Sequence, residues 1–105
     1  MEKSDRMLML KEMLGANPGD PFLQHAMALE YIRLNRDEDA AECFSNLLQA
    51  DPDYLGSYYH YAQVLLRLGR REESFRFFEK GMELAKKTGD MKTFSELHSA
   101  MEEAD

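Results

Sequence analysis

Residues 27–36, MALEYIRLNR, and residues 61–70, YAQVLLRLGR, decide the fold because the same pattern recurs in both, 34 positions apart. Each stretch opens on a large apolar residue followed by Ala, continues with apolar residues at helical spacing, and closes on Asn-Arg or Gly-Arg. The same offset also pairs Pro18 with Pro52, Ala40 with Ser74, Phe44 with Phe78 and Leu48 with Met82. This period is typical of helix pairs that stack because each is too small to bury its apolar face alone. The sequence therefore predicts an all-α solenoid of antiparallel helix hairpins.

Helix-breaking and capping residues divide this solenoid into about six helices. Asp20 is a predicted N-cap before Pro21, which the first turn of a helix tolerates. Asn35 and, one period later, Gly69 occupy positions suited to the left-handed conformation that ends a helix. Asp37 and Asp53 are predicted to cap the helices that follow them.

These boundaries predict one domain over residues 1–105. Residues 3–15 form an N-terminal half-repeat or cap helix, 21–52 the first repeat, 55–88 the second repeat and 91–103 a C-terminal capping helix.

Composition narrows the class of function. The chain has 20 acidic and 13 basic residues, a net charge of −7, which would repel nucleic acid. No apolar stretch approaches the roughly 20 residues of a membrane span. Cys43 is the single cysteine, and the N-terminus lacks the pattern of a secretion signal. We therefore expect a cytoplasmic protein with neither a nucleic-acid nor a membrane partner.

The residues that repeat resemble the tetratricopeptide repeat family, in the form of a small bacterial-type member. Its pattern places aromatic and small residues on the first helix, then Ala, a large aromatic and Pro on the second. The first unit shows this pattern in Met27-Ala28, Tyr31, Ala40, Phe44 and Pro52, and the second in Tyr58, Tyr61-Ala62, Leu65, Ser74 and Phe78. Gln24, Gly81 and Lys86 depart from it. The resemblance implies a helical scaffold or adaptor for protein binding.

In this family the first helix of each pair usually lines a concave groove that binds a peptide or protein segment. The resemblance then implies a groove lined by Phe22, His25, Leu29, Ile32 and Arg33 from one unit and by Tyr59, Gln63, Leu66 and Arg67 from the next. Leu29 and Tyr59 would be apolar anchors, and the two Arg residues would clamp an acidic or C-terminal carboxylate group. Alternatively, Leu29, Ile32 and Leu66 pack against neighbouring helices and the Arg residues only solvate the edge.

Two other classes of function, self-association and catalysis, are alternatives to peptide binding in a groove. Self-association through an end helix, giving a homodimer or a subunit of a larger complex, is the alternative, since Met7, Met9, Met13, Met91 and Met101 concentrate in the end helices. An enzyme is not expected. His25, His60 and His98 lie on separate predicted helices without ligand partners at metal-binding spacing, and no phosphate loop or nucleophile elbow occurs. The sequence thus predicts no catalytic residue, metal or cofactor.

Overall fold

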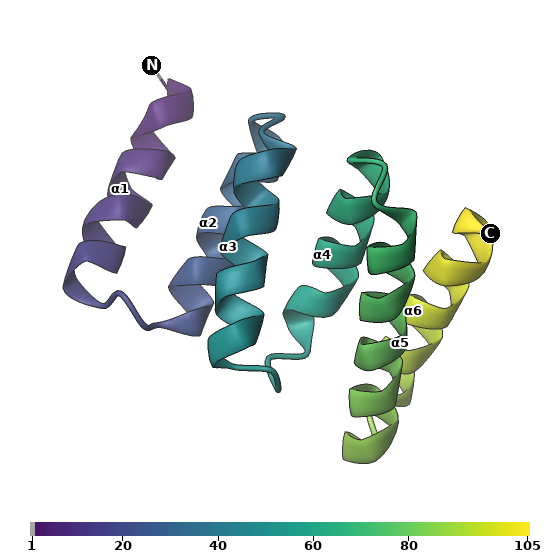
Figure 1. The fold of residues 1–105 in the computed structure, drawn as a ribbon. Coiled ribbons are helices and arrows are strands. Elements are labelled where there is room, and N and C mark those ends of the chain that lie inside the picture. The colour runs from purple at the N-terminus through teal and green to yellow at the C-terminus, as the bar shows by residue number, and fades with distance from the viewer. Residues whose placement is uncertain (1) are drawn as a thin grey trace. The chain divides into compact units, whose positions relative to one another are not determined.

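The computed structural model describes the backbone of residues 2–105 and the side chains of residues 5–105. This part of the chain forms six helices and contains no strand (Figure 1). The helices are α1 (Glu2–Ala16), α2 (Pro21–Arg33), α3 (Asp37–Ala50), α4 (Gly56–Arg67), α5 (Arg71–Thr88) and α6 (Met91–Ala104). They group into two compact units, which meet in sequence between Pro52 and Asp53.

Unit 1 consists of α1, α2 and α3. The hairpin of α2 and α3 is its most extensive helix contact, and α1 packs beside α2 (Figure 1). One cluster of buried side chains joins α1 to α2, namely Met7, Leu10, Leu23 and Met27. Tyr31 and Leu34, two residues of the predicted apolar stripe, pack against that cluster. The stripe therefore faces the interior, as its spacing indicates.

Unit 2 consists of α4, α5 and α6. The hairpin of α4 and α5 is again extensive, and α6 packs against α5 (Figure 1). Ser74 on α5 is fully buried, and its hydroxyl donates a 2.7 Å hydrogen bond to the carbonyl oxygen of Ala62 on α4. Of the three closely spaced phenylalanines on α5, Phe78 is buried, whereas Phe75 and Phe77 are half-buried. A helix cannot turn all three toward one side.

The predicted helix ends at Asn35 and Gly69 are confirmed. Both residues have positive φ, 60° for Asn35 and 80° for Gly69. After each of them an Arg N–H donates back across the last turn: Arg36 to the carbonyl of Tyr31, and Arg70 to the carbonyl of Leu65, each at 2.8 Å. These bonds satisfy carbonyl groups that a helix end otherwise leaves without partners.

The predicted N-caps are partly wrong. Asp20 caps α2 as expected, since its carboxylate accepts hydrogen bonds from the N–H groups of Phe22 and Leu23. Asp37 is instead the first residue of α3, where its negative charge faces the positive end of the helix dipole. Asp53 does not cap α4 either, because α4 begins later, at Gly56, without a side-chain cap.

Gly81 marks the closest approach of helices in unit 2. A Cβ atom at this position would lie 2.8 Å from Cβ of Tyr58 on α4 and 2.9 Å from Cδ1 of Leu97 on α6. Both distances are shorter than van der Waals contact allows. The glycine that departs from the family pattern therefore lets α5 pack closely against both of its neighbours.

Candidate binding surface

In unit 1, the predicted groove residues follow one face of α2. Phe22 is 65% exposed at the start of the helix, while His25, Leu29 and Ile32 are half-buried. The imidazole of His25 meets the ring of Phe44 on α3 edge to face, with centroids 5.8 Å apart. This face therefore presents one largely exposed aromatic ring and three half-buried side chains.

Arg33, the fifth predicted groove residue of unit 1, is bound to a buried carboxylate that sequence reasoning did not single out. Glu30 is only 3% exposed, and it accepts hydrogen bonds from the Arg33 guanidinium, one of them 3.1 Å from Nε. Arg6 on α1 adds a 3.3 Å ion pair to the same carboxylate. The hydrogen bonds from Arg33 lower the pKa of Glu30 below its usual value, against the opposing effect of burial. Arg33 thus has a structural partner while over half of its side chain stays exposed.

In unit 2, the structure places the four predicted groove residues along α4. Tyr59 and Arg67 are exposed, whereas Gln63 and Leu66 are half-buried. Tyr59 meets the imidazole of His60 edge to face, with ring centroids 5.4 Å apart.

Tyr59 also lines an open pocket of about 650 Å³ between α4 and α6, here called the α4–α6 pocket. Its lining residues are Tyr59, His60, Ser95, Glu96, Ser99, Ala100 and Glu103. The four α6 residues other than Ala100 are exposed, while Ala100 is buried at the floor. Gln63, Leu66 and Arg67 are not among the lining residues. The pocket therefore combines an aromatic wall, two hydroxyl groups and two carboxylates.

The charged groups that line the α4–α6 pocket are negative. Burial, and secondarily the positive charge of Arg67, lower the pKa of His60, so its imidazole is neutral at pH 7. Glu96 forms a 3.6 Å ion pair with Lys92, one turn earlier on α6, but both side chains are mostly exposed. Such surface pairs contribute little free energy. Glu96 and Glu103 are therefore the charged groups of the pocket near neutral pH.

The α6 side of this pocket was missed from the sequence. The sequence predicts a capping helix here, with its charged face toward water, and a groove lined by residues of α2 and α4 alone. The available signal is the spacing of Ser95, Ser99 and Glu103, each four positions from the next, with Glu96 three positions before Ser99, which places all four on one side of the helix. Leu97, which is buried, lies on the other side of α6, whereas the buried Ala100 lies beside the pocket residues and lines the pocket with them.

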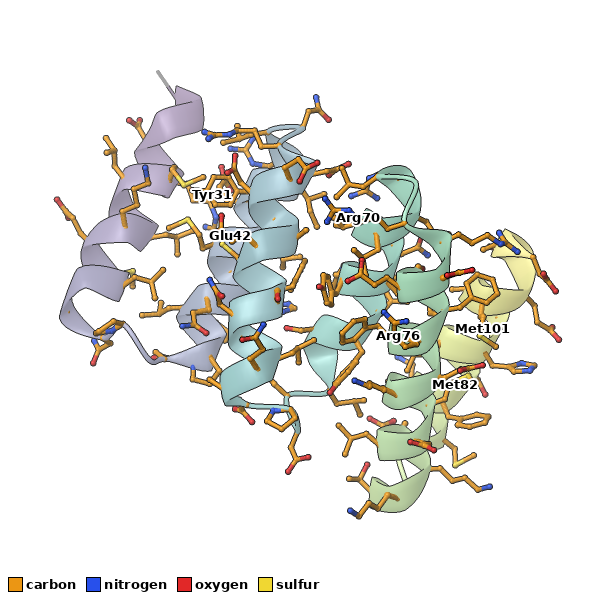
Figure 2. All side chains as sticks on the ribbon, viewed as in Figure 1. Tyr31, Glu42, Arg70, Arg76, Met82 and Met101 are labelled. Carbon is orange, nitrogen blue, oxygen red and sulfur yellow. The ribbon has the colours of Figure 1, made fainter. Side chains whose placement is uncertain are left out.

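A second pocket in unit 2 has mixed charge. It lies at the start of α5 and is lined by Gly69, Arg70, Arg71, Glu72, Glu73 and Arg76 (Figure 2 labels Arg70 and Arg76). Arg71 already donates hydrogen bonds to the carbonyl of Ala104, at 2.7 Å, and to the carboxylate of Asp105, at 3.0 Å. Because Arg71 is already bound, the positive charges of Arg70 and Arg76 are balanced by the negative charges of Glu72 and Glu73. The lining of this pocket therefore favours neither an anionic nor a cationic ligand.

Outside these two pockets, the side chains that could bind a metal ion or act as a nucleophile do not form a cluster in the described part of the chain. From Asp5 onward, no three His, Cys, Asp or Glu side chains gather closely enough to hold a metal ion. Cys43 is a free, half-buried thiol, and burial raises its pKa to about 11. It is therefore protonated and a poor nucleophile at neutral pH.

None of the helices in residues 2–105 is both long enough and apolar enough to cross a membrane.

Comparison with known proteins identifies the family. The model of the tetratricopeptide repeat matches residues 23–54 and 55–88. A tetratricopeptide repeat domain protein from Salinibacter ruber, solved by solution NMR, is 35% identical over 84% of this chain and 89% of its own, with a TM-score of 0.78. A crystal structure of such a domain from the same organism gives 35% identity, 81% and 94% coverage and a TM-score of 0.76.

A crystal structure of MamA shares the fold at a TM-score of 0.79, with 19% identity over 85% of this chain. The chain spans 52%, about half, of the length of MamA. No curated protein matches. These similarities confirm the predicted all-α fold class of repeated helix hairpins. The chain belongs to the tetratricopeptide repeat family, and its general role is that of a protein–protein interaction module.

Proposed function

We propose that the chain binds an extended or helical segment of a partner protein at the α4–α6 pocket, with Tyr59 as the apolar anchor. One observation carries this proposal: Tyr59, an anchor expected from the sequence, keeps 37% of its surface exposed and lines an open pocket within a single unit. Tyr side chains are intermediate in burial, and one that lines an open pocket offers an aromatic surface that a ligand can cover.

The volume and the lining residues of the α4–α6 pocket both suit a peptide ligand. Its volume of about 650 Å³ lies in the range of small-ligand sites, roughly 300–1,000 Å³. Binding free energy concentrates on aromatic residues such as Tyr59, which lose little conformational entropy when they are covered. Ser95 and Ser99 add hydroxyl groups that both donate and accept hydrogen bonds, as the exposed backbone of an extended segment requires.

The remaining predicted groove residues stay part of the proposal. In unit 1, exposed Phe22 with Leu29 and Ile32 would form a second apolar contact surface. In a clamp by Arg33 and Arg67, an acidic group would compete at Arg33 with the Glu30 carboxylate, which the guanidinium already binds. We also propose that α1 acts as a half-repeat and α6 as a capping helix of one domain, in a non-catalytic, cytoplasmic adaptor.

The test is selection of binders from a random dodecapeptide library displayed on phage, followed by fluorescence polarisation with the synthetic peptides. Tyr59→Ala should weaken these peptides, since burial of an aromatic anchor is lost. Met91→Ala is the matched control, because Met91 is an exposed apolar residue of the same unit outside the pocket. Peptides that bind wild type and Tyr59→Ala equally well would exclude this pocket as the binding site.

Self-association is a second candidate function, favoured by the exposed apolar residues of α1. Leu8, Met9 and Met13 are all exposed there, and Met9 and Met13 lie one turn apart on the same face. A second copy of the chain could cover them. Light scattering after size exclusion should then show a dimer that Met9→Glu with Met13→Glu converts to a monomer. If wild type is a monomer at high concentration, self-association is excluded, whereas the proposal of peptide binding is not affected by this result.

A further inference from the structure

We infer that the segment bound at the α4–α6 pocket carries a Lys or Arg residue, whose alkyl stem covers Tyr59 and whose cationic head reaches the carboxylates of Glu96 and Glu103. This inference rests on the proposed function and names the chemistry of its ligand. The expected clamp on an acidic group involves Arg33 and Arg67, which do not line this pocket.

The charge of the lining residues carries the inference. Glu96 and Glu103 supply two negative charges, and no Lys or Arg lines the pocket. His60, the remaining titratable nitrogen base of the lining, faces Tyr59, and its imidazole adds no positive charge near neutral pH. An acidic segment would meet repulsion without compensation, whereas a basic one would be attracted.

The spacing on α6 sets where the cation binds. Glu96 and Glu103 are seven residues apart, two turns of the helix, so they lie roughly 10 Å apart along its axis at about 1.5 Å per residue. Ser99 lies between them on the same face. A cationic head anywhere along this face is therefore within reach of at least one carboxylate, because the side chains of Lys and Glu are both long and flexible.

Tyr59 suits the rest of a basic side chain. Lys and Arg bury their methylene groups on apolar surfaces while the charged head remains in a polar environment. Cations also bind favourably to the face of a tyrosine ring. The ion pair of Lys92 with Glu96 is no barrier, because Lys92 is 87% exposed and its pairing is easily exchanged for a ligand cation.

The test uses the dodecapeptides selected on wild-type protein, each also synthesised with its Lys replaced by norleucine or its Arg by citrulline. Norleucine keeps the four-carbon stem of Lys without its ammonium group, and citrulline keeps the planar shape of Arg without its charge. The protein variants are Glu96→Gln, Glu103→Gln and their combination. Glu79→Gln is the matched control, since Glu79 is an exposed carboxylate on α5 that does not line the pocket.

Basic residues should be enriched among selected peptides, and at least one pocket variant should weaken them by roughly two- to fivefold, as an exposed ion pair does. The loss should shrink at high salt, and it should disappear for the uncharged peptides. Peptides that depend on Tyr59 but respond alike to the pocket variants and to Glu79→Gln would overturn this inference alone. Absence of any peptide that depends on Tyr59 would overturn the proposed function and this inference together.

Discussion

Substitution of Gly81 by alanine tests the close helix packing of unit 2. The new Cβ would lie 2.8 Å from Cβ of Tyr58, an atom fixed to the backbone of α4, and 2.9 Å from the methyl group of Leu97. The leucine can rotate, but the tyrosine Cβ cannot move unless the two helices separate. Overpacking of this kind costs about 1–3 kcal/mol. The higher helix propensity of alanine returns about 1 kcal/mol.

We therefore expect Gly81→Ala to lower the free energy of unfolding by up to about 2 kcal/mol. Gly56→Ala is the control, because its Cβ would meet no packed neighbour within 4 Å; Gly56 is the first residue of α4, where the propensity gain is smaller, so the variant should be neutral or slightly stabilised. Urea denaturation followed by circular dichroism measures both, compared at equal m-value. A Gly81→Ala protein as stable as the Gly56→Ala protein would refute the argument from close approach.

Three further predictions concern polar groups that are buried or half-buried. Ser74→Ala should cost about 1 kcal/mol of unfolding free energy, because the buried hydrogen bond to the Ala62 carbonyl is lost; thermal melting measures it, and an unchanged midpoint would contradict it. Arg33→Gln should raise the pKa of folded Glu30 toward its unfolded value of 4.5, so that the variant is less stable than wild type at neutral pH and loses less stability as pH falls below about 4.5. An acid titration followed by circular dichroism that superimposes on wild type would contradict this. Because the pKa of His60 is lowered on folding, stability should also fall as pH drops from about 6.5 toward the lowered value, and His60→Gln should remove this loss. Urea denaturation at a series of pH values measures it, and the same pH dependence in both proteins would count against it.

The hairpins could be predicted because their determinants are local and repeated. An apolar stripe at helical spacing, followed by Asn35 or Gly69, specifies a helix and its end within one short stretch. The caps at Asp37 and Asp53 were wrong because several residues near each helix start can serve, and the choice depends on where the connecting turn ends.

The pocket could not be predicted, because it depends on how α6 packs within unit 2. The matched 34-residue pattern ends with α5, and the sequence of α6 predicts only a capping helix. Burial of Leu97 and Ala100 decides which side of α6 is left beside Tyr59, and this burial depends on tertiary packing.

Glu30 shows a second limit of sequence reasoning. It occupies the repeat position at which the next unit has the buried Val64, so the offset alone predicts an apolar side chain there. The buried carboxylate of Glu30 is accommodated because Arg33 on α2 and Arg6 on α1 both bind it. Pairing across helices depends on tertiary packing, which the 34-residue pattern does not specify.

The most direct test of the central claim is an amide chemical-shift titration of the ¹⁵N-labelled protein with a selected peptide. The claim is that a partner segment binds between α4 and α6 through Tyr59. It predicts that the largest shift changes occur at Tyr59, His60, Ser95, Glu96, Ser99 and Glu103. Changes concentrated on α1, or on the Phe22 face of α2, with the pocket residues unmoved, would contradict it.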